Sequence, residues 1–370
     1  MCQTFVFVRV AYTLEQCWHD VPGGTARAAL EVARELHASS ELDLVGVSAY
    51  HRRPPAPAWV PPIPVRALPL PRLALYEAWH LARRPAVQRA TGPVDVIHAT
   101  GVAIPPHSAP LVVTVHDLAY VADPSQFTAK GRRFFAQALR LLRRDADLIL
   151  CSSQATWGDC VAAGLPQRKL RLVPLGLRPV EVSPGDVTTT LARYGLERPF
   201  VLSVGTLEPR KNLPALIEAF SRLARPDVDL VLVGASGWHT EIEPLVRPLG
   251  SRARVLGFLP NADRDALYAG AAVFCYPSLF EGFGLPVLEA MGAGTPVVTS
   301  AGTATAEAAG EAGLLIDPRD VGAITEGLER VLGDPCLAAE LGRAGRLRAA
   351  EFSWARTAEL TRSAYQELIA

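Results

Sequence analysis

Short apolar runs and longer amphipathic runs alternate along most of the chain. The short runs lack regular polar alternation, which is typical of strands buried on both faces of a parallel sheet. The longer runs repeat apolar residues at helical spacing and predict helices that cover a sheet with one face. The alternation predicts an α/β protein. Strands are expected at residues 4–11, 42–49, 94–99, 111–115, 148–152, 171–174, 200–204, 229–233, 254–259, 271–276, 295–299 and 313–316, and helices at 25–37, 73–89, 131–144, 153–163, 213–223, 263–269, 287–292, 321–332, 337–350 and 354–369.

The elements fall into two series, separated by a segment rich in proline and glycine at 175–186. A chain of 370 residues is also long enough for two domains. We therefore expect Rossmann-like domains at residues 1–175 and 176–353. The last helix, 354–370, has nothing left to pair with in the second domain, so we expect it to cross back to the first.

One long segment of the first domain, 54–71, is rich in proline. Proline is excluded from helix interiors and from central strands, so we expect a loop. It is either a lid or wall for an acceptor, together with residues 12–20, or an inserted surface loop.

The composition narrows the class of protein. Lysine plus arginine and aspartate plus glutamate number 37 each, so the net charge gives no reason to expect a nucleic-acid partner. The six cysteines show no CxxC spacing, which favours reduced thiols in a cytoplasmic protein over a disulfide framework or a metal site. The apolar start, 4–12, lacks the marks of a signal peptide, and no apolar run is long enough to span a membrane.

The expected helix 131–144 reads GRRFFAQALRLLRR, with apolar residues on one face and five arginines among them. A basic amphipathic helix of this kind can lie on anionic lipid. The alternative is a helix whose apolar stripe faces the core and whose arginines are solvated, as on any surface helix. A peripheral contact with the inner membrane surface is thus one reading of this segment.

The most informative stretch, 280–290, reads FEGFGLPVLEA. It joins the expected strand 271–276 to the expected helix 287–292, and a glycine turn at a helix N-terminus is a common anion site. Glu281 and Glu289 are ill suited to phosphate but accept hydrogen bonds from sugar hydroxyls. Together these features indicate a nucleotide-sugar site, and the alternative is an ordinary α/β turn.

A second candidate site lies in the turn 205–212, which joins the expected strand 200–204 to the helix 213–223. Arg210 and Lys211 lie there beside the helix N-terminus. The helix dipole disfavours two adjacent cations unless an anion lies between them. This favours a bound phosphate over solvated surface charges.

The first domain offers weaker candidates. Gly23 and Gly24 separate a strand from a helix, as in phosphate-binding turns, but without the dinucleotide or P-loop motifs. His116 follows the expected strand 111–115, and open α/β sheets bind ligands at the carboxyl ends of their strands. The alternative is a structural histidine that caps the loop with Asp117.

Taken together, these motifs resemble the retaining glycosyltransferases of family 4, which have the GT-B fold. The resemblance is strongest over residues 201–318, where GTLEPRKN, RVLGFLPNADRDALYAGA, FEGFGLPVLEAM and GAGTPVV follow in the family's order and spacing. The first domain matches more loosely, through Pro22-Gly23-Gly24, His116-Asp117 and SSQAT near Ser152. The resemblance implies two Rossmann-like domains facing each other across a cleft, and a hexosyltransferase that retains the anomeric configuration.

The resemblance also implies roles for the matched residues. The catalytic set would be His116, Glu281, Arg210 and Lys211. Of these, Arg210 and Lys211 would bind the donor diphosphate and His116 would contact the transferred sugar. The donor would be bound by Gly23 and Gly24 over the diphosphate, Gly257, Phe258 and Leu259 near the base, Glu281 with the amides of Gly282, Phe283, Gly284 and Leu285 at the sugar and distal phosphate, and Glu289 at the ribose.

The leading donor is GDP-mannose, and the acceptor is a hydroxyl of a glycan, a glycolipid or a small molecule. No metal or cofactor is expected, because the cations and the helix N-terminus can stabilise the leaving diphosphate. One alternative is a UDP-sugar-dependent glucosyl- or N-acetylglucosaminyltransferase. Alternatives of another class are a nucleotide-sugar epimerase and a non-catalytic binder. The chain departs from the family's pattern at 302–307, where GTATAE replaces the usual glycines and Pro-Glu, so the conformation of that loop is left open.

Overall fold

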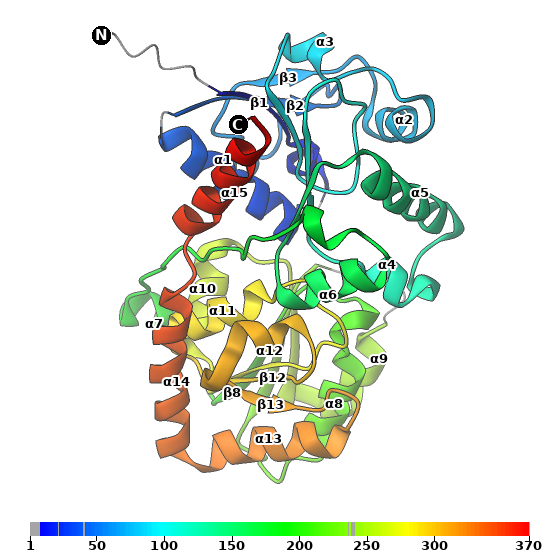
Figure 1. Ribbon diagram of the computed structural model, residues 1–370. Helices are drawn as coiled ribbons and strands as arrows, with labels where there is room; N and C mark the ends of the chain where they lie inside the picture. Colours follow the sequence, from blue (N-terminus) through cyan, green and yellow to red (C-terminus); the bar gives the residue numbers. More distant parts are fainter. Residues whose placement is uncertain (1–7, 21, 40, 236, 238–240, 370) are drawn as a thin grey trace. The chain divides into compact units, whose positions relative to one another are not determined.

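The structure is a computed structural model that describes residues 8–20, 22–39, 41–235, 237 and 241–369. The chain forms two compact units, Met1–Gly176 with Ser353–Ala370, and Leu177–Phe352 (Figure 1). Each unit is an α/β body built on its own sheet.

The first unit is built on a parallel sheet. Among the described residues, seven strands pair in the order β3-β2-β1-β4-β5-β6-β7. The order reverses between β1 and β4, which is where a doubly wound sheet opens a crevice at its carboxyl edge. The strands are β1 (Val8–Thr13), β2 (Leu42–Ser48), β3 (Val65–Ala67), β4 (Val96–Ala99), β5 (Leu111–Val115), β6 (Leu148–Cys151) and β7 (Leu170–Leu172).

Helices cover both faces of the first sheet, so most residues of its central strands are apolar and buried. One face packs against α1 (Gly24–Ala38) and α15 (Trp354–Ile369), which lie side by side. The other face packs against α5 (Ala129–Asp145) and α6 (Gln154–Ala162) (Figure 1). The remaining elements are α2 (Arg72–Glu77), α3 (Gln88–Thr91), α4 (Ala119–Ala122), a π-helical turn (Ala78–Ala82) and 3₁₀ turns at Glu15–Trp18, Pro57–Trp59, Pro124–Gln126 and Gln167–Lys169.

The C-terminal helix belongs to the first unit. The chain leaves this unit at Gly176, which lies so close to the start of α15 that a Cβ there would be 2.2 Å from the backbone nitrogen of Trp354. Thr357 of α15 donates a hydrogen bond to the carbonyl of Pro174 at 2.8 Å. These contacts fix the returning helix to the segment where the chain leaves.

The second unit repeats the architecture with a six-stranded parallel sheet in its described part, in the order β10-β9-β8-β11-β12-β13. Here the order reverses between β8 and β11, so these strands flank the crevice position. The strands are β8 (Phe200–Val204), β9 (Asp229–Val233), β10 (Ala253–Gly257), β11 (Val273–Tyr276), β12 (Val297–Ser300) and β13 (Leu314–Ile316).

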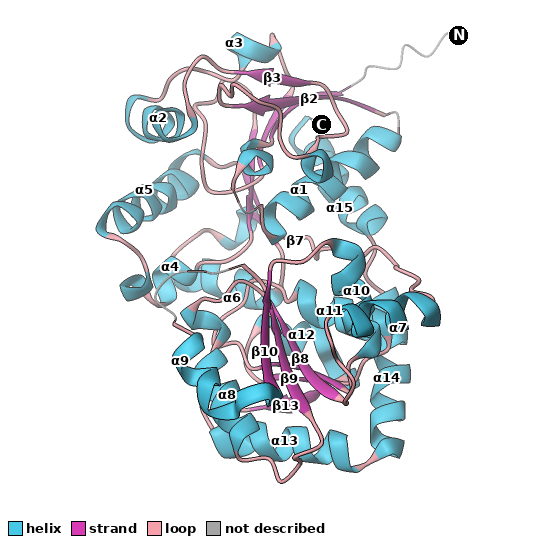
Figure 2. Cartoon of the chain, turned by 180° about the vertical axis from the view of Figure 1, so that it is seen from behind, coloured by secondary structure: helices cyan, strands magenta, loops and turns pink. Residues whose placement is uncertain are grey.

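Figure 2 shows the second sheet between two layers of helices. One face packs against α8 (Leu213–Ser221) and α13 (Val321–Gly333) through an apolar core, and the other carries α10 (Asn261–Gly270) and α11 (Leu285–Ala293). The other elements are α7 (Pro184–Arg193), α9 (Glu243–Val246), α12 (Ala304–Ala309), α14 (Pro335–Ala350) and 3₁₀ turns at Pro209–Lys211, Arg247–Arg252 and Gly310–Ala312.

The expected helix 73–89 is broken in the structure. Helix α2 passes into the π-helical turn, Arg83 adopts a left-handed conformation with φ 51°, and a new helix, α3, begins only at Gln88. The cause is Pro85, which supplies no N–H to a helix and disfavours helical geometry in the residue before it. The prediction of one continuous helix is wrong.

The prediction of a loop over the whole of 54–71 is also wrong, because strand β3 lies within it. The strand lies at the edge of the sheet, where it pairs with β2 alone, and its three residues contain no proline. Four helices of the described residues, α4, α7, α9 and α12, are likewise absent from the expected set. Helix α7 begins at Pro184, inside the segment expected to be a linker, because Ser183 caps it by accepting a hydrogen bond from the Asp186 amide. The expected first strand also differs: residues 4–7 lie outside the described part, and β1 runs on to Thr13.

Candidate active site

The candidate site of the second unit is built where β8 and β11 end. After β8 the chain turns at Gly205 and forms a 3₁₀ turn that carries Arg210 and Lys211 to the start of α8. After β11 it runs through Ser278 to Glu281 and then to α11. Because parallel strands end at the same edge, the fold brings these segments together at the switch point of the sheet.

Glu281 is the centre of this cluster. Its carboxylate accepts hydrogen bonds from Arg210 at 3.0 Å, from the Tyr276 hydroxyl at 3.0 Å and from the Ser278 hydroxyl at 2.8 Å, and it makes a hydrogen-bonded ion pair with Lys211. The residue is 9% exposed and Lys211 is 6% exposed. A buried carboxylate is tolerable only with this density of donors.

The electrostatics follow from burial and pairing. Burial alone would raise the pKa of Glu281, but the charges of Arg210 and Lys211 and the hydrogen bonds lower it to about 2. Burial lowers the pKa of Lys211, and its carboxylate partners oppose that shift only in part. The carboxylate is therefore firmly ionised near neutral pH.

Arg210 and Lys211 have counter-charges within the protein. The two cations were expected to require an external anion between them, but the protein supplies its own. Glu281 pairs with both, and Glu208 pairs with Arg210 at 2.5 Å and lies 3.9 Å from Lys211. The pairing of charges at this turn therefore does not by itself demand a phosphate.

The glycine turn before α11 leaves a helix N-terminus open to a ligand. Gly284 is the N-cap residue and has φ 105°, a conformation that favours glycine. A Cβ there would also lie 3.2 Å from the Thr305 side chain. Gly284 has no side chain to cap α11, Pro286 has no N–H, and the Val287 amide donates to the Gly284 carbonyl at 3.0 Å. The Leu285 amide is therefore the first-turn group that can meet a ligand. The neighbouring Phe283 is buried and packs edge-on against Phe352, with ring centroids 5.7 Å apart.

Glu289 lies further along α11 and is held from α10. The Tyr268 hydroxyl donates to its Oε2 at 3.0 Å, and Arg264 lies 3.6 Å from its Oε1. Tyr268 is buried, and Arg264 is also hydrogen-bonded to Asp265. The carboxylate of Glu289 is thus oriented by two side chains of the adjacent helix.

The remaining donor positions lie around β10 and α1. Gly257 ends β10 with φ 67°, Phe258 beyond it is exposed and Leu259 is buried. In the first unit, Gly23 caps α1 and Gly24 begins it, with open space around the position of a Gly23 Cβ. Their contacts with a base or a diphosphate stay predictions.

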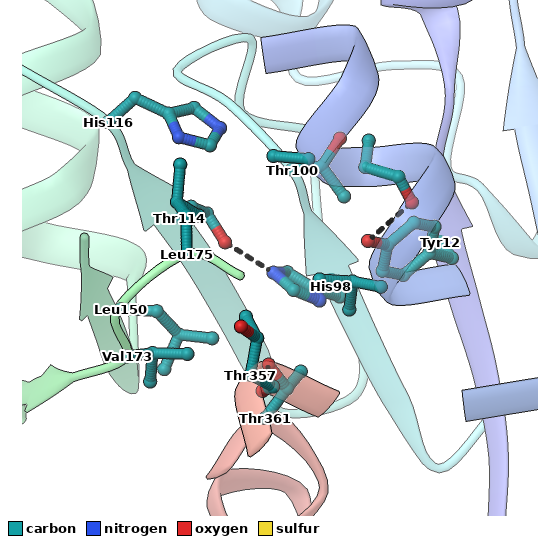
Figure 3. Close-up of a pocket in the computed structure, with 13 residues that line it drawn as sticks. Tyr12, His98, Thr100, Thr114, His116, Leu150, Val173, Leu175, Thr357 and Thr361 are labelled. Carbon is teal, nitrogen blue, oxygen red and sulfur yellow. Dashed lines mark hydrogen bonds between the residues drawn. The ribbon is translucent and has the colours of Figure 1, made fainter. Parts of the chain in front are cut away.

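His116 follows β5 in the first unit and lines a small cavity under α1 and α15 (Figure 3). Burial lowers the pKa of its imidazole, although Asp117 and the Thr100 backbone oppose that shift. The ring nitrogen Nε2 is buried, and within the described residues it has no protein hydrogen-bond partner. Near neutral pH this histidine is a neutral hydrogen-bonding group, and its contact with a transferred sugar stays a prediction.

Two family models cover both units of the chain. The model described as Glycosyl transferases group 1 matches residues 192–348, and the model described as Glycosyltransferase Family 4 matches residues 22–181. The chain is also 32% identical to the O-antigen chain mannosyltransferase B of Escherichia coli over 283 residues, which cover 74% of each protein. The chain belongs to the family 4 glycosyltransferases.

A second relative of this glycosyltransferase and a solved structure give the same picture. The chain is 32% identical to an MMP alpha-(1->4)-mannosyltransferase of Mycolicibacterium hassiacum over 305 residues, covering 75% of this chain and 72% of that protein. Among solved structures, Anabaena HepE in complex with UDP and glucose superposes with a TM-score of 0.77 at 19% identity, covering 98% of this chain and 100% of that one. The fold is therefore GT-B, and the protein is a hexosyltransferase.

Several contacts that build the glycosyltransferase site were not expected from the sequence. Tyr276 and Ser278 meet Glu281 through the fold, and Tyr268 and Arg264 meet Glu289 across two helices. The nearest signal was position: Arg264 and Tyr268 lie inside a matched block, and Tyr276 and Ser278 lie just before another. Position alone does not say which residue contacts which.

The described residues of this glycosyltransferase contain neither a candidate membrane span nor a candidate metal cluster. No helix in that part of the chain is long and apolar enough to cross a membrane. No group of three or more His, Cys, Asp or Glu within it is arranged to hold a metal ion. That transfer proceeds without a metal stays a prediction.

Proposed function

We propose that this glycosyltransferase moves mannose from GDP-mannose to an acceptor hydroxyl with retention of the anomeric configuration. The observation that carries the proposal is the cluster of Arg210, Lys211 and Glu281 at the carboxyl ends of β8 and β11, beside the open N-terminus of α11. This arrangement combines cations and an amide for a diphosphate with a carboxylate for sugar hydroxyls.

The cluster is preorganised for a transition state that builds negative charge on the leaving diphosphate. Glu281 holds Arg210 and Lys211 side by side, so the donors need little rearrangement when the phosphates arrive. Removing one such fixed donor commonly lowers turnover by about 10²–10³-fold. We assign charge stabilisation to the two cations and the Leu285 amide of α11, with no metal required.

Retention is best explained by attack on the same face of the sugar, in which the leaving phosphate oxygen takes the acceptor's proton. A double displacement through Glu281 is less favourable, because four donors already engage this carboxylate and hold its pKa near 2. His116 is assigned to a hydrogen bond with the transferred sugar, as a neutral group.

The choice of mannose and guanosine rests on the names of relatives. Beyond the two mannosyltransferases above, a GDP-mannose-dependent alpha-(1-6)-phosphatidylinositol monomannoside mannosyltransferase of Mycolicibacterium smegmatis is 34% identical over 60% of this chain. The competing donor is a UDP-sugar. An epimerase or a non-catalytic binder is the alternative of another class, and the complete cluster speaks against the binder.

We assign the acceptor, a glycan, glycolipid or small molecule, to the first unit, near residues 12–20 and 54–71. Trp18 stacks on His51 there, with ring centroids 5.0 Å apart and planes at 10°, and Glu15 holds His51 at 2.9 Å. Flat aromatic faces fixed in this way are suited to sugar rings.

We place the enzyme at the cytoplasmic face of the membrane, with helix α5 as the peripheral contact. Its apolar residues pack inward, with Phe135 stacked on Tyr120 at 4.4 Å. The exposed arginines Arg132, Arg133 and Arg140 are left to meet anionic lipid.

The test is turnover with GDP-mannose, UDP-glucose, UDP-N-acetylglucosamine and ADP-glucose in parallel, on a panel of acceptors. NMR of the product then gives the anomeric configuration. We expect transfer from GDP-mannose with an α-linked product. Preferred use of a UDP-sugar would overturn the donor assignment, and a β-linked product would overturn retention. Nucleotide release that needs no acceptor and yields an epimerised sugar would favour the epimerase.

A further inference from the structure

A chain of buried hydrogen bonds runs from the C-terminal helix into the first sheet. The Tyr365 hydroxyl of α15 lies 2.6 Å from Nδ1 of His98 on β4. Nε2 of the same ring lies 2.8 Å from the Thr114 hydroxyl on β5 (Figure 3). Tyr365 and His98 are 267 residues apart in sequence and both are almost fully buried, at 0% and 2% exposed.

The chain has a defined direction. Burial raises the pKa of Tyr365 and lowers that of His98 to about 3, so the phenol keeps its proton and the imidazole is neutral. A neutral imidazole has one donor and one acceptor nitrogen. Among the described residues, Nδ1 is the one hydrogen-bond partner of the Tyr365 hydroxyl, so the phenol O–H donates to it. Nε2 therefore carries the ring proton and donates to Thr114. The hydroxyl hydrogen of Thr114 is then left to be donated onward.

The cavity beside Thr114 indicates what accepts the hydrogen bond from its hydroxyl. Thr114 and His116 lie two positions apart and both line it, from the same face of the chain (Figure 3). The cavity has a volume of about 20 Å³, enough for one water molecule. Buried polar atoms in proteins are nearly always hydrogen-bonded, so Nε2 of His116, which lacks a protein partner among the described residues, needs an explanation.

We propose that the cavity binds one structural water that accepts a hydrogen bond from Thr114 and donates one to Nε2 of His116. Through this water, the chain from Tyr365 to Thr114 acts together with the Thr100 backbone to set the protonated nitrogen of His116. Nε2 is the acceptor, so the ring proton is on Nδ1, where the Thr100 backbone stabilises it. Tyr365, His98 and Thr114 are therefore positioning residues for His116.

The consequence for transfer rests on the proposed function, in which His116 faces the transferred sugar. A ring with one fixed tautomer presents one fixed donor, whereas a ring that exchanges between tautomers presents the correct donor for only part of the time. The C-terminal helix would thus influence the sugar site without touching the sugar.

The test compares two matched variants of the full-length protein. Thr114→Val removes the hydroxyl of the chain, and Thr361→Val removes a hydroxyl of α15 that lines the same cavity but donates to the Thr357 carbonyl. Histidine ¹⁵N spectra report the tautomer of His116, whose signal is identified by its loss in His116→Gln. We expect the Nδ1–H tautomer in the wild type and in Thr361→Val, and a mixture in Thr114→Val.

Thr114→Val should lower kcat about tenfold with KM for the donor within about twofold, and Thr361→Val should change neither. Tyr365→Phe, which removes the first donor far from His116, should shift the tautomer in the same direction. An unchanged His116 signal in both Thr114→Val and Tyr365→Phe overturns the proposed water chain, whatever the activity. A wild type that transfers no sugar from any donor contradicts the proposed function instead, while the spectra still test the chain.

Discussion

The two units share one sheet order but carry opposite chemistry at the carboxyl ends of their central strands. Beyond β8 and β11, the second unit gathers charged groups around an ionised Glu281. Near the carboxyl ends of β4 and β5, the first unit places a neutral imidazole, that of His98, between a phenol and a threonine hydroxyl. The same backbone topology therefore fixes where a site forms, and the side chains decide whether it handles charge or hydrogen bonds.

Burial also affects the charge of a side chain differently in the two units. In the second unit, burial is opposed by opposite charge, so Glu281 stays ionised and its pKa falls to about 2. In the first unit, burial meets no such partner, so the pKa of His98 falls to about 3 and the ring stays neutral. A buried group is charged only where the fold supplies its counter-charge.

The largest effect should come from removing both cations of the second unit. In the double variant Arg210→Gln/Lys211→Gln, we expect turnover to fall by at least about 10²–10³-fold, because the charge on the leaving diphosphate loses two fixed donors. The measurement is kcat for transfer and for donor hydrolysis.

The control for that variant carries the same change in charge elsewhere. Arg222 and Arg343 are exposed in the same unit, so Arg222→Gln/Arg343→Gln should retain wild-type turnover. Circular dichroism and thermal unfolding check that both proteins fold. Full activity of the Arg210/Lys211 variant would refute the assigned role.

The second prediction is that the two units lose stability in different pH ranges. The pKa of His98, about 3, and those of His80 and His19, about 4, lie below the ordinary 6.5. The unfolded chain therefore binds more protons below about pH 6.5, and the first unit loses stability as the pH falls from 6.5 toward 3. Glu281 contributes stability that is fully present above pH 4.5 and is lost only as the pH falls from 4.5 to about 2.

Hydrogen exchange at pH 7 and pH 5 checks this order. Amides of the first sheet should open more readily at pH 5, and those of the second sheet should not. At lower pH, the difference in free energy of unfolding between the wild type and Glu281→Gln should shrink by about 3 kcal/mol between pH 4.5 and 2. Equal loss of protection in both units at pH 5 would contradict the comparison.

A third, smaller effect concerns Glu289. Tyr268→Phe removes one of the two groups that orient its carboxylate, so we expect the Kd for the nucleotide to rise about 3- to 10-fold. Tyr194→Phe is the matched control, since that hydroxyl bonds Asp263 on the same helix, at 2.7 Å.

Nucleotides that lack the ribose 2′-hydroxyl sharpen this test. If Glu289 binds the ribose, the variant Tyr268→Phe should discriminate less between GDP and 2′-deoxy-GDP than the wild type does. Tyr194→Phe should discriminate as the wild type does. If Tyr268→Phe discriminates between GDP and 2′-deoxy-GDP as strongly as the wild type does, Tyr268 does not contribute to ribose binding.

The smallest effect should come from the surface of the first unit. Replacing one exposed arginine of α5, Arg133, by glutamine should reduce sedimentation with vesicles containing anionic lipid by a few fold, because one arginine near the surface contributes about 1 kcal/mol. Transfer to a soluble acceptor should be unchanged. Equal sedimentation with neutral and anionic vesicles would argue against this contact.

The sequence predicted most of the regular structure, because parallel strands and their helices carry strong local patterns. The matched blocks also pointed to Arg210, Lys211 and Glu281, which the structure brings together. The failures have physical causes. Pro85 breaks the expected helix 73–89, and β3 forms because an edge strand needs only one partner.

The contacts of the site were harder to foresee. The counter-anions of Arg210 and Lys211 are Glu208 and Glu281, and a pattern of residues does not reveal that one side chain neutralises another across a turn. The chain from Tyr365 to His98 joins residues 267 positions apart, and only the return of α15 to the first unit creates it. Such pairs depend on tertiary structure, which local propensity does not encode.

The most direct test of the central claim is calorimetry with GDP and GMP on the wild type and on Arg210→Gln/Lys211→Gln. The account predicts that the wild type binds GDP at least about tenfold more tightly than GMP, since each charge-assisted bond to the second phosphate contributes about 1.5–3 kcal/mol. The double variant should lose this preference for GDP over GMP. Its affinity for GMP should differ less from that of the wild type than its affinity for GDP does. An unchanged preference for GDP in the double variant would show that the diphosphate is held elsewhere.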